Sequence, residues 1–572
     1  MKRRILCVPE TRPGHGTGHI KRCLELIASI GDTNSGVLLL HSDTKAVQLV
    51  PEHLRIQQPQ GTYDLVVIDT RDVSRRLVRY YARFGLVVGI DAKGTGRRYC
   101  DYLIDILPHI HTSVPPNVCE PGFLTQPENV RVTPPQDFSR ILLVFGGEDA
   151  LGLSSKVAAK LVSIGVAPER ISALIGSAFW EQTYPDGVQL IRNMQNAREH
   201  FAEYDLVITP FSLSLFEAAA AGCAVVGFHP SRYHQKLADM AGFHTIGVRH
   251  IRQKRLKALF DNPEHYVSAL TQKTVHEPQS LATHLLQLRP LQTIGSPVAG
   301  ERCNPGILRT AKETFFRCRK TRLVYKQRYF PLTVQYNQDY FSNEYRKQYG
   351  RSYLEDYEKI RQMGTDRLQI INKLLPEQGS LLDLGCAYGP FLQAAQDDGW
   401  QPYGIDISAA AVEWVRNNLN IPVYTGDVLT SDPIALFNTP GFSVVSLWYV
   451  IEHIAELGEL LRKINLLLQP NGVCALATPN GSGISAKKSF HRFLLDGPPD
   501  HLTIFEPRYM QRLFGSFGFH VEKIRITGHH PERFPLLGKT GVGRRCAAML
   551  SRSLGLGDTF ELYVRKVGAP LL

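Results

Sequence analysis

Leu381-Leu-Asp-Leu-Gly-Cys-Ala-Tyr-Gly389 is the stretch that decides the fold of the second half of this 572-residue chain. An apolar run enters a turn with glycines at positions 385 and 389, and apolar residues at helical spacing follow. Tyr403-Gly-Ile-Asp406 and Thr425-Gly-Asp427 then each place an acid after a strand-like run. Strand, glycine turn, helix and strand-end acid together predict a crossover unit that binds a nucleotide.

In the order of these motifs, residues 340–566 resemble the class I S-adenosylmethionine-dependent methyltransferases. The resemblance implies a seven-stranded Rossmann-like domain that uses S-adenosyl-L-methionine as its cofactor. It implies that Asp383, Gly385 and Gly389 form the first binding motif. It also implies that Asp406 holds the ribose and that Asp427 holds the adenine amino group.

The methyl acceptor is expected to face the loop after the fourth strand, Val444 to His453. Transfer to an oxygen requires alignment with the sulfonium methyl group and removal of one proton. His453 and His501 are the candidate bases, although a histidine at a helix N-terminus and a histidine that braces a loop are the alternatives. We expect no metal, because the donor is already activated. Methyltransferases that act on nucleic-acid bases often carry an Asn/Asp-Pro-Pro-aromatic tetrad after the fourth strand. Leu447-Trp-Tyr-Val stands at that position here, which disfavours methylation of a base. An oxygen on a sugar is therefore the expected acceptor.

Composition indicates a soluble globular protein of several domains, with 43% hydrophobic and 21% charged residues. No long apolar stretch predicts a membrane-spanning helix, and the apolar run after Met1-Lys-Arg-Arg4 is too short for a signal peptide. The ten cysteines are scattered singly, which suggests neither a zinc site nor a disulfide framework. We therefore expect a cytoplasmic protein.

A net charge of +12 fits an anionic partner, and much of it gathers in one segment. The basic residues of this segment are Arg309, Lys312, Arg317, Arg319, Lys320, Arg322, Lys326 and Arg328. One interpretation is a solvated linker helix within the basic linker at 289–335. The other is peripheral contact with an anionic membrane or a charged glycan carrier. Nucleic acid is an unlikely partner, since no recognisable nucleic-acid module accompanies the run.

The first half of the chain alternates short apolar runs with helical patterns, which predicts parallel sheets covered on both faces. The expected strands are residues 5–9, 36–41, 64–69, 86–91, 141–145, 171–175, 205–209 and 224–228. A proline-rich segment separates two lobes. The predicted domains are a Rossmann-like lobe at 1–135, a nucleotide-sugar-binding lobe at 136–288, the basic linker at 289–335 and the methyltransferase domain at 336–572.

A glycine-rich loop, Gly14-His-Gly-Thr-Gly-His19-Ile-Lys-Arg22, follows the first expected strand directly. Glycines between a strand and a helix N-terminus open a space lined by backbone amides, which suits a phosphate. His19 and Arg22 are three residues apart and lie on neighbouring parts of the helix face. His19 fits a general base, although a capping or core histidine is an equal alternative.

Three later segments add to this loop, namely Leu142–Asp149, Ile191–Thr209 and Leu213–Gly222. Together they make residues 3–285 resemble the two-lobed glycosyltransferase-B fold. The resemblance is greatest to the UDP-sugar hydrolases of pseudaminic acid biosynthesis. In that family a histidine activates the water that attacks the anomeric carbon, and His19 would inherit this role. The nucleotide-sugar would be held by residues matched from the family, namely Gly18, Arg22, Gly146, Gly147, Glu217 and Gln235.

One departure from the family concerns the loop before Glu217, where Phe211-Ser-Leu-Ser214 replaces a glycine-rich segment. Side chains in such a loop hinder backbone approach to a phosphate. An active hydrolase, a glycosyltransferase and a non-catalytic glycan-binding module therefore all remain open for the N-terminal half. The sequence as a whole predicts a methyltransferase fused to a nucleotide-sugar hydrolase-like module of surface-glycan biosynthesis.

Overall fold

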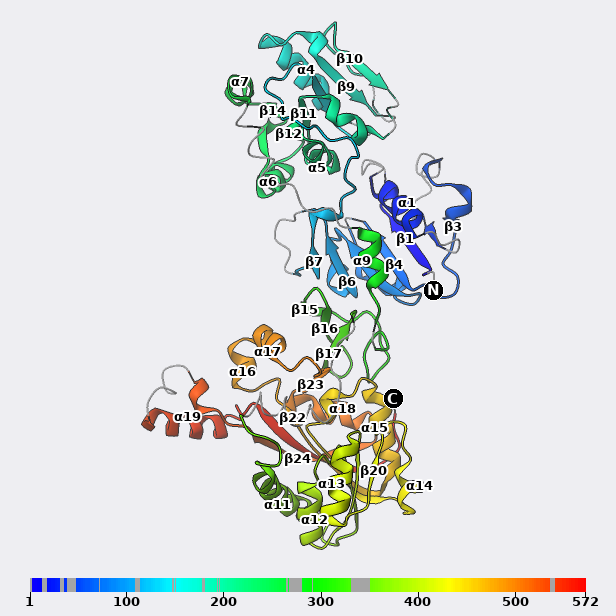
Figure 1. Ribbon diagram of the computed structural model, residues 1–572, viewed down its shortest axis with the longest axis vertical. Helices are drawn as coiled ribbons and strands as arrows, with labels where there is room; N and C mark the ends of the chain where they lie inside the picture. The colour runs from blue at the N-terminus through cyan, green and yellow to red at the C-terminus, as the bar shows by residue number, and fades with distance from the viewer. Residues whose placement is uncertain are drawn as a thin grey trace. The chain divides into compact units, whose positions relative to one another are not determined.

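The computed structural model describes residues 3–12, 18–30, 35–38, 48–70, 72–107, 114–146, 149, 151–176, 179, 181–192, 194, 196–263, 266, 280–290, 292–330, 350–534 and 541–571. The chain forms two compact units (Figure 1). The first comprises Met1–Arg289 and Arg309–Lys312, and the second comprises Pro290–Leu308 and Glu313–Leu572.

The N-terminal unit begins with a seven-stranded parallel sheet in the order β3-β2-β1-β4-β5-β6-β7. Its central strands are buried along their whole length, as expected for a sheet covered on both faces. The elements are β1 Ile5–Pro9, α1 Gly18–Ile30, β2 Gly36–Leu38, β3 Arg55–Ile56, β4 Leu65–Asp69, α3 Arg75–Tyr81, β5 Leu86–Ile90, β6 Tyr102–Asp105 and β7 Val118–Cys119.

A second seven-stranded sheet follows in the order β10-β9-β8-β11-β12-β13-β14, parallel except for the last pair. The elements are β8 Ile141–Val144, α4 Leu153–Ser163, β9 Ile171–Ile175, β10 Gln189–Arg192, β11 Leu206–Thr209, α5 Leu213–Ala220, β12 Ala224–His229, α6 Arg232–Met240, β13 His244–Val248, β14 His250–Ile251, α7 Gln253–Asp261 and α9 Leu281–Gln287. The prediction of two successive parallel sheets is thus confirmed.

The basic segment forms strands and no helix, so its interpretation as a solvated linker helix is wrong. Strands β15 Gly306–Arg309, β16 Glu313–Arg317 and β17 Val324–Arg328 join β23 Thr503–Ile504 in one sheet. All of β17 is buried, including Lys326 and Arg328. Phe316 and Tyr325 stack with ring centroids 5.5 Å apart, inside the core of the C-terminal unit. The aromatic residues of this segment therefore attach it to the core of the C-terminal unit, although charged residues lie between them in the sequence.

The C-terminal unit is built on a seven-stranded sheet in the order β20-β19-β18-β21-β22-β25-β24, with β25 antiparallel to both neighbours. The last two strands of the chain are therefore an antiparallel pair at one side of an otherwise parallel sheet. The strands are β18 Ser380–Leu384, β19 Gln401–Asp406, β20 Val423–Thr425, β21 Phe442–Trp448, β22 Leu468–Pro479, β24 Phe519–Thr527 and β25 Thr559–Lys566. The helices are α11 Tyr357–Leu374, α12 Pro390–Asp397, α13 Ala409–Leu419, α14 Pro433–Phe437, α15 Leu457–Leu467, α16 Ile484–Lys488, α17 Phe490–Asp496, α18 Met510–Gly515 and α19 Gly541–Ser553.

Within the described residues, no helix combines the length and the apolar character that crossing a membrane requires.

Candidate functional sites

The turn between β18 and α12 has the open backbone that the sequence predicts. Gly385 and Gly389 have φ of 79° and 74°, and Ala387 between them has φ of 46°. A Cβ atom on Gly385 would lie 2.5 Å from Cγ2 of Val450, so glycine is required by conformation and by space. The loop that follows β21 therefore packs directly against this turn.

The three expected donor-binding acids lie at one edge of the sheet, because β18, β19 and β20 are parallel neighbours. The Asp406 carboxylate accepts one N–H bond from Ala387 and one from Ser408, each of 2.8 Å. Asp383 accepts a 2.7 Å bond from the Ser446 hydroxyl. Asp427 is exposed, and its carboxylate accepts a bond from the Leu429 N–H.

Burial changes the acidity of two of these groups. Desolvation raises the pKa of Asp383 to about 7, although the Ser446 hydroxyl opposes the shift. Desolvation also raises the pKa of Asp406, and the two backbone N–H bonds offset part of that rise. A cationic donor placed beside Asp383 would favour the ionised form of its carboxyl.

A polar cluster forms where the loop after β21 meets the segment before β23. Nδ1 of His453 lies 3.2 Å from a carboxylate oxygen of Asp500, and the rings of His453 and His501 meet edge to face at 4.8 Å. Glu452 is buried, and one of its oxygens accepts a bond from Thr478 while the other has no hydrogen-bond partner. The structure therefore brings the two candidate bases into one cluster.

The two histidines of the cluster differ in basicity. Burial alone would lower the pKa of His453, but the Asp500 hydrogen bond and the Glu452 charge outweigh it, and the pKa is raised. Burial and the neighbouring His453 lower the pKa of His501 to about 3. The Asp500 contact, together with the opposite directions of the two pKa shifts, favours His453 over His501 for accepting a proton.

The same cluster is also a set of groups that could hold a metal ion. One ligand atom each from Glu452, His453 and His501 lie within 4.8 Å of one another. The imidazoles and the carboxylate are ligand types that zinc and other first-row divalent metals accept.

In the N-terminal unit, His19 and Arg22 meet on one buried carboxylate. Nδ1 of His19 lies 2.7 Å from Oδ1 of Asp69, and two guanidinium nitrogens of Arg22 donate to the Asp69 carboxylate at 2.5 and 2.7 Å. Arg22 also donates to Asp91 at 3.0 Å. Burial opposes ionisation of Asp69, but the charge of Arg22 outweighs it and lowers the pKa of that carboxyl. With Nδ1 of His19 held by Asp69, Nε2 remains to accept a proton.

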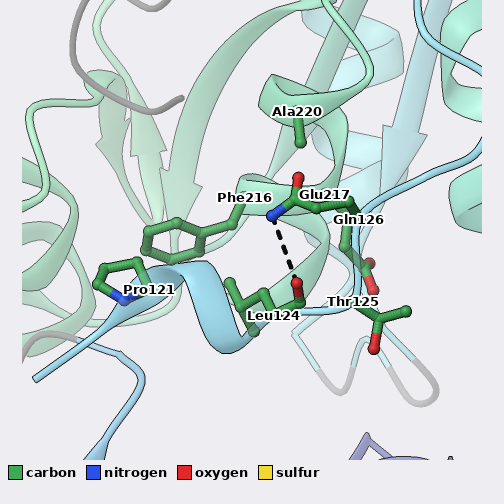
Figure 2. A pocket seen from close by; sticks show the side chains of 7 residues that line it. All are labelled: Pro121, Leu124, Thr125, Gln126, Phe216, Glu217 and Ala220. Carbon is green, nitrogen blue, oxygen red and sulfur yellow. Dashed lines mark hydrogen bonds between the residues drawn. The ribbon is translucent and has the colours of Figure 1, made fainter. Parts of the chain in front are cut away.

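Glu217 lines a pocket formed by α5 and the segment that precedes the second lobe. Figure 2 shows Phe216, Glu217 and Ala220 of α5 opposite a second group of residues. That group is Pro121, Leu124, Thr125 and Gln126. Desolvation raises the pKa of Glu217 to about 7, partly offset by the charge of Arg198. The partly buried carboxyl is therefore a weaker acid than a solvent-exposed glutamate.

The remaining expected nucleotide-sugar residues are placed as follows. A Cβ atom on Gly18, which begins α1, would lie 3.2 Å from Leu213 at the start of α5. Gly146 follows β8 with φ of 77° and open space at its Cβ position. Gln235 on α6 donates to the Thr245 hydroxyl at 3.3 Å. Gly147 lies outside the described residues.

Three acids that contact expected site residues were missed by the sequence reasoning: Asp69 beside His19, Asp91 beside Arg22 and Asp500 beside His453. Asp69 is the last residue of the buried strand β4, and Asp91 comes directly after β5, so strand-end position was a signal available for both. Asp500 precedes His501 in the chain but contacts His453. That pairing depends on the folded course of two loops and has no signature in sequence spacing.

Comparison with known proteins identifies the C-terminal fold. A family described as a methyltransferase domain matches residues 353–524. Ubiquinone biosynthesis O-methyltransferase of Rhodopseudomonas palustris is 32% identical over 105 residues, 18% of this chain and 40% of that protein. The enzyme of the same name from Bartonella tribocorum is 26% identical over 160 residues, 26% of this chain and 63% of that protein. The chain thus spans less than two thirds of either relative.

Among solved structures, a SAM-dependent methyltransferase from Archaeoglobus fulgidus is 18% identical. The match covers 40% of this chain and all of that one, with a TM-score of 0.30. From the family match and the motifs together, the C-terminal unit contains a class I S-adenosylmethionine-dependent methyltransferase domain, whose cofactor is S-adenosylmethionine. The family match begins at residue 353, so it does not include the two parallel sheets of the N-terminal unit.

Proposed function

We propose that the C-terminal unit transfers the methyl group of S-adenosylmethionine to a hydroxyl oxygen, with His453 as the general base. The observation that carries the proposal is the Asp500–His453 pair on a loop packed against the glycine turn. Asp500 holds Nδ1, so Nε2 of His453 can take the acceptor proton as the oxygen attacks the methyl carbon. The names of the two relatives, both O-methyltransferases, support an oxygen acceptor.

The donor is held, in this proposal, by Gly385, Gly389, Asp406 and Asp427 at the sheet edge. Each oxygen of the Asp406 carboxylate accepts one backbone bond and keeps a lone pair for a ribose hydroxyl. Once bound, S-adenosylmethionine supplies an electrophilic methyl group and a neutral thioether leaving group. No cation is required for this step, so the metal-ligand set is not part of the mechanism.

The test measures S-adenosylhomocysteine formation with sugar, nucleotide-sugar and phenolic hydroxyl acceptors. His453→Gln should lower kcat by about a hundredfold, within the usual range for a general base, while donor affinity in calorimetry stays unchanged. Asp406→Ala should instead weaken donor binding, since a charge-assisted hydrogen bond is worth about 1.5–3 kcal/mol. Full activity of His453→Gln would remove the proposed base.

For the N-terminal unit we infer a nucleotide-sugar hydrolase of glycosyltransferase-B type, with His19 as the base that activates water. The support is the Asp69–His19 pair at the start of α1 and the partly buried Glu217 in the pocket beside α5. Asp69 plays the positioning part here that Asp500 plays for His453. Fusion to this module is the basis for proposing a sugar or glycan as the methyl acceptor.

Release of UDP from a panel of UDP-sugars tests this inference. His19→Gln should abolish release, and Asp406→Ala should leave it unchanged because that carboxylate belongs to the donor site of the other unit. No release from any UDP-sugar would exclude the hydrolase. Transfer of the sugar to an acceptor would then favour a glycosyltransferase, and binding without turnover would favour a glycan-binding module.

A further inference from the structure

Helix α19 belongs to the connection that joins β24 to its antiparallel partner β25, at the edge of the C-terminal unit (Figure 1). Its attachment uses a stripe of small residues, Gly543, Ala547 and Ser551, which are buried at i, i+4 and i+8 spacing. Nδ1 of His529 lies 2.7 Å from the Ser551 hydroxyl, and the Leu556 N–H closes the helix end on the Ser551 carbonyl. The helix therefore packs against the domain through this narrow stripe of small residues.

Beside that line, α19 presents apolar side chains to solvent. Val542 and Met549 are 76% and 72% exposed, Leu550 is 41% exposed, and Cys546 is exposed. The spacing i, i+4, i+7 and i+8 puts all four side chains on one face of the helix. Leu554, just after the helix, is 63% exposed. A contiguous apolar face of this kind on a folded domain indicates an interaction surface.

The other exposed face of the helix is basic. Arg544, Arg545 and Arg552 are exposed, and the sequence of α19 contains no aspartate or glutamate. A helix with one apolar face, arginines on the other and little burial has the pattern of helices that lie in the plane of a membrane surface. The arginines therefore favour a lipid partner over a protein partner. A protein groove would need several acidic side chains beside its apolar surface, whereas an anionic bilayer has negative headgroups over its whole surface.

We propose that α19 docks the protein onto an anionic lipid bilayer. Val542, Cys546, Met549 and Leu550 enter the boundary between headgroups and acyl chains, and Arg545 and Arg552 contact lipid phosphates. The helix lies in the membrane plane and does not span the bilayer. This inference rests on the residues of α19 alone and does not depend on the proposed reactions.

Co-sedimentation of the full chain with vesicles tests the proposal. Binding should occur with vesicles of phosphatidylcholine and phosphatidylglycerol, should weaken as salt is added, and should be slight with phosphatidylcholine alone. Val542→Ser with Met549→Ser, and separately Arg545→Glu with Arg552→Glu, should each weaken partition by about tenfold or more. The controls are Leu466→Ser, at a leucine that is 73% exposed on α15, and Lys359→Glu with Lys373→Glu on exposed positions of α11.

The cysteines provide a second readout in the unmodified protein. Of the ten cysteines, Cys546 lies on the apolar face of α19, Cys119 is exposed in the N-terminal unit, and the other eight are buried. Anionic vesicles should slow maleimide labelling of Cys546 and leave labelling of Cys119 unchanged. The proposal is overturned if both sites keep their rates, or if the α19 variants sediment like the wild type. Self-association lost in Val542→Ser with Met549→Ser, without vesicle binding, would instead assign the face to a second copy of the chain.

Discussion

At the residue scale, each candidate site holds a histidine by a carboxylate from a distant part of the chain. For His453 the Asp500 carboxylate is one of the groups that raise the pKa. The rate of methyl transfer should therefore rise with pH through a value above the ordinary histidine pKa of about 6.5, as His453 loses its proton. Asp500→Asn should move that rise to lower pH and lower the limiting rate by about tenfold.

A pH–rate profile at saturating donor checks this prediction. Asp496→Asn is the matched control, because Asp496 is an exposed carboxylate at the end of α17, in the same stretch of chain. An unshifted profile with an undiminished rate in Asp500→Asn would show that another group accepts the proton. A merely structural role for Asp500 would lower the rate without moving the profile.

Asp69 gives a prediction about stability. Its pKa is lowered in the folded protein, so it contributes stability above its unfolded pKa, and that contribution is lost as pH falls through the folded pKa. At neutral pH, Asp69→Asn should destabilise the N-terminal unit by about 3 kcal/mol, because Arg22, whose side chain is only 11% exposed, loses one of its two partners. In acid the difference from wild type should shrink.

Thermal unfolding at neutral and acid pH measures that difference. Asp72→Asn is the control, since the side chain of Asp72 is 73% exposed and should contribute little. UDP release, where present, should also fall in Asp69→Asn because His19 loses its positioning carboxylate. An equal loss of stability at both pH values would contradict the assigned cause.

At the scale of elements, the glycine turn after β18 gives a test with an internal control. Gly385 and Gly399 both have positive φ, but a Cβ meets Val450 at 2.5 Å in the first case and nothing within 4 Å in the second. Gly399→Ala should cost about 1–2 kcal/mol from backbone strain alone. Gly385→Ala should cost more and should weaken donor binding, since the loop carrying Val450 has to move.

Chemical unfolding and donor calorimetry separate the two effects. Combining Gly385→Ala with Val450→Ala should recover the steric part of the loss and leave the strain. Equal costs for Gly385→Ala and Gly399→Ala would mean that the loop after β21 does not depend on the turn. In that case the packing of this loop against the glycine turn would no longer support His453 as the general base.

Elements also show how far the sequence could predict the structure. The strands of the parallel sheets were predictable because both faces are buried and their residues are almost all apolar, as in Leu65–Asp69. Strand β17 was not, because Lys326 and Arg328 suggest solvent although both are buried. Lys326 donates to the Pro499 carbonyl, which is remote in sequence, and lies near Glu313 on the neighbouring strand β16. The glycine turn was local and predictable, whereas the Asp500–His453 pair was not.

At the scale of the whole molecule, the basic segment determines where the two units can be separated. Residues 298–325 supply Val298, Phe316, Leu323 and Tyr325 to the main core of the C-terminal unit. The sequence predicted a domain that begins at residue 336, because charge concealed these apolar contributions. The compact unit in the structure begins at Pro290.

Two truncated proteins test this division. A fragment of residues 290–572 should fold cooperatively and bind S-adenosylmethionine. A fragment of residues 336–572 loses five buried side chains of the core, the four named above and Cys318. The large apolar ones are each worth about 1.5–3 kcal/mol and together approach the whole stability of a domain. It should therefore be insoluble or melt without a cooperative transition. Circular dichroism and donor calorimetry on both fragments decide the matter, with the full chain as reference. Equal stability and affinity of the two fragments would make residues 290–335 the linker that their charge suggests.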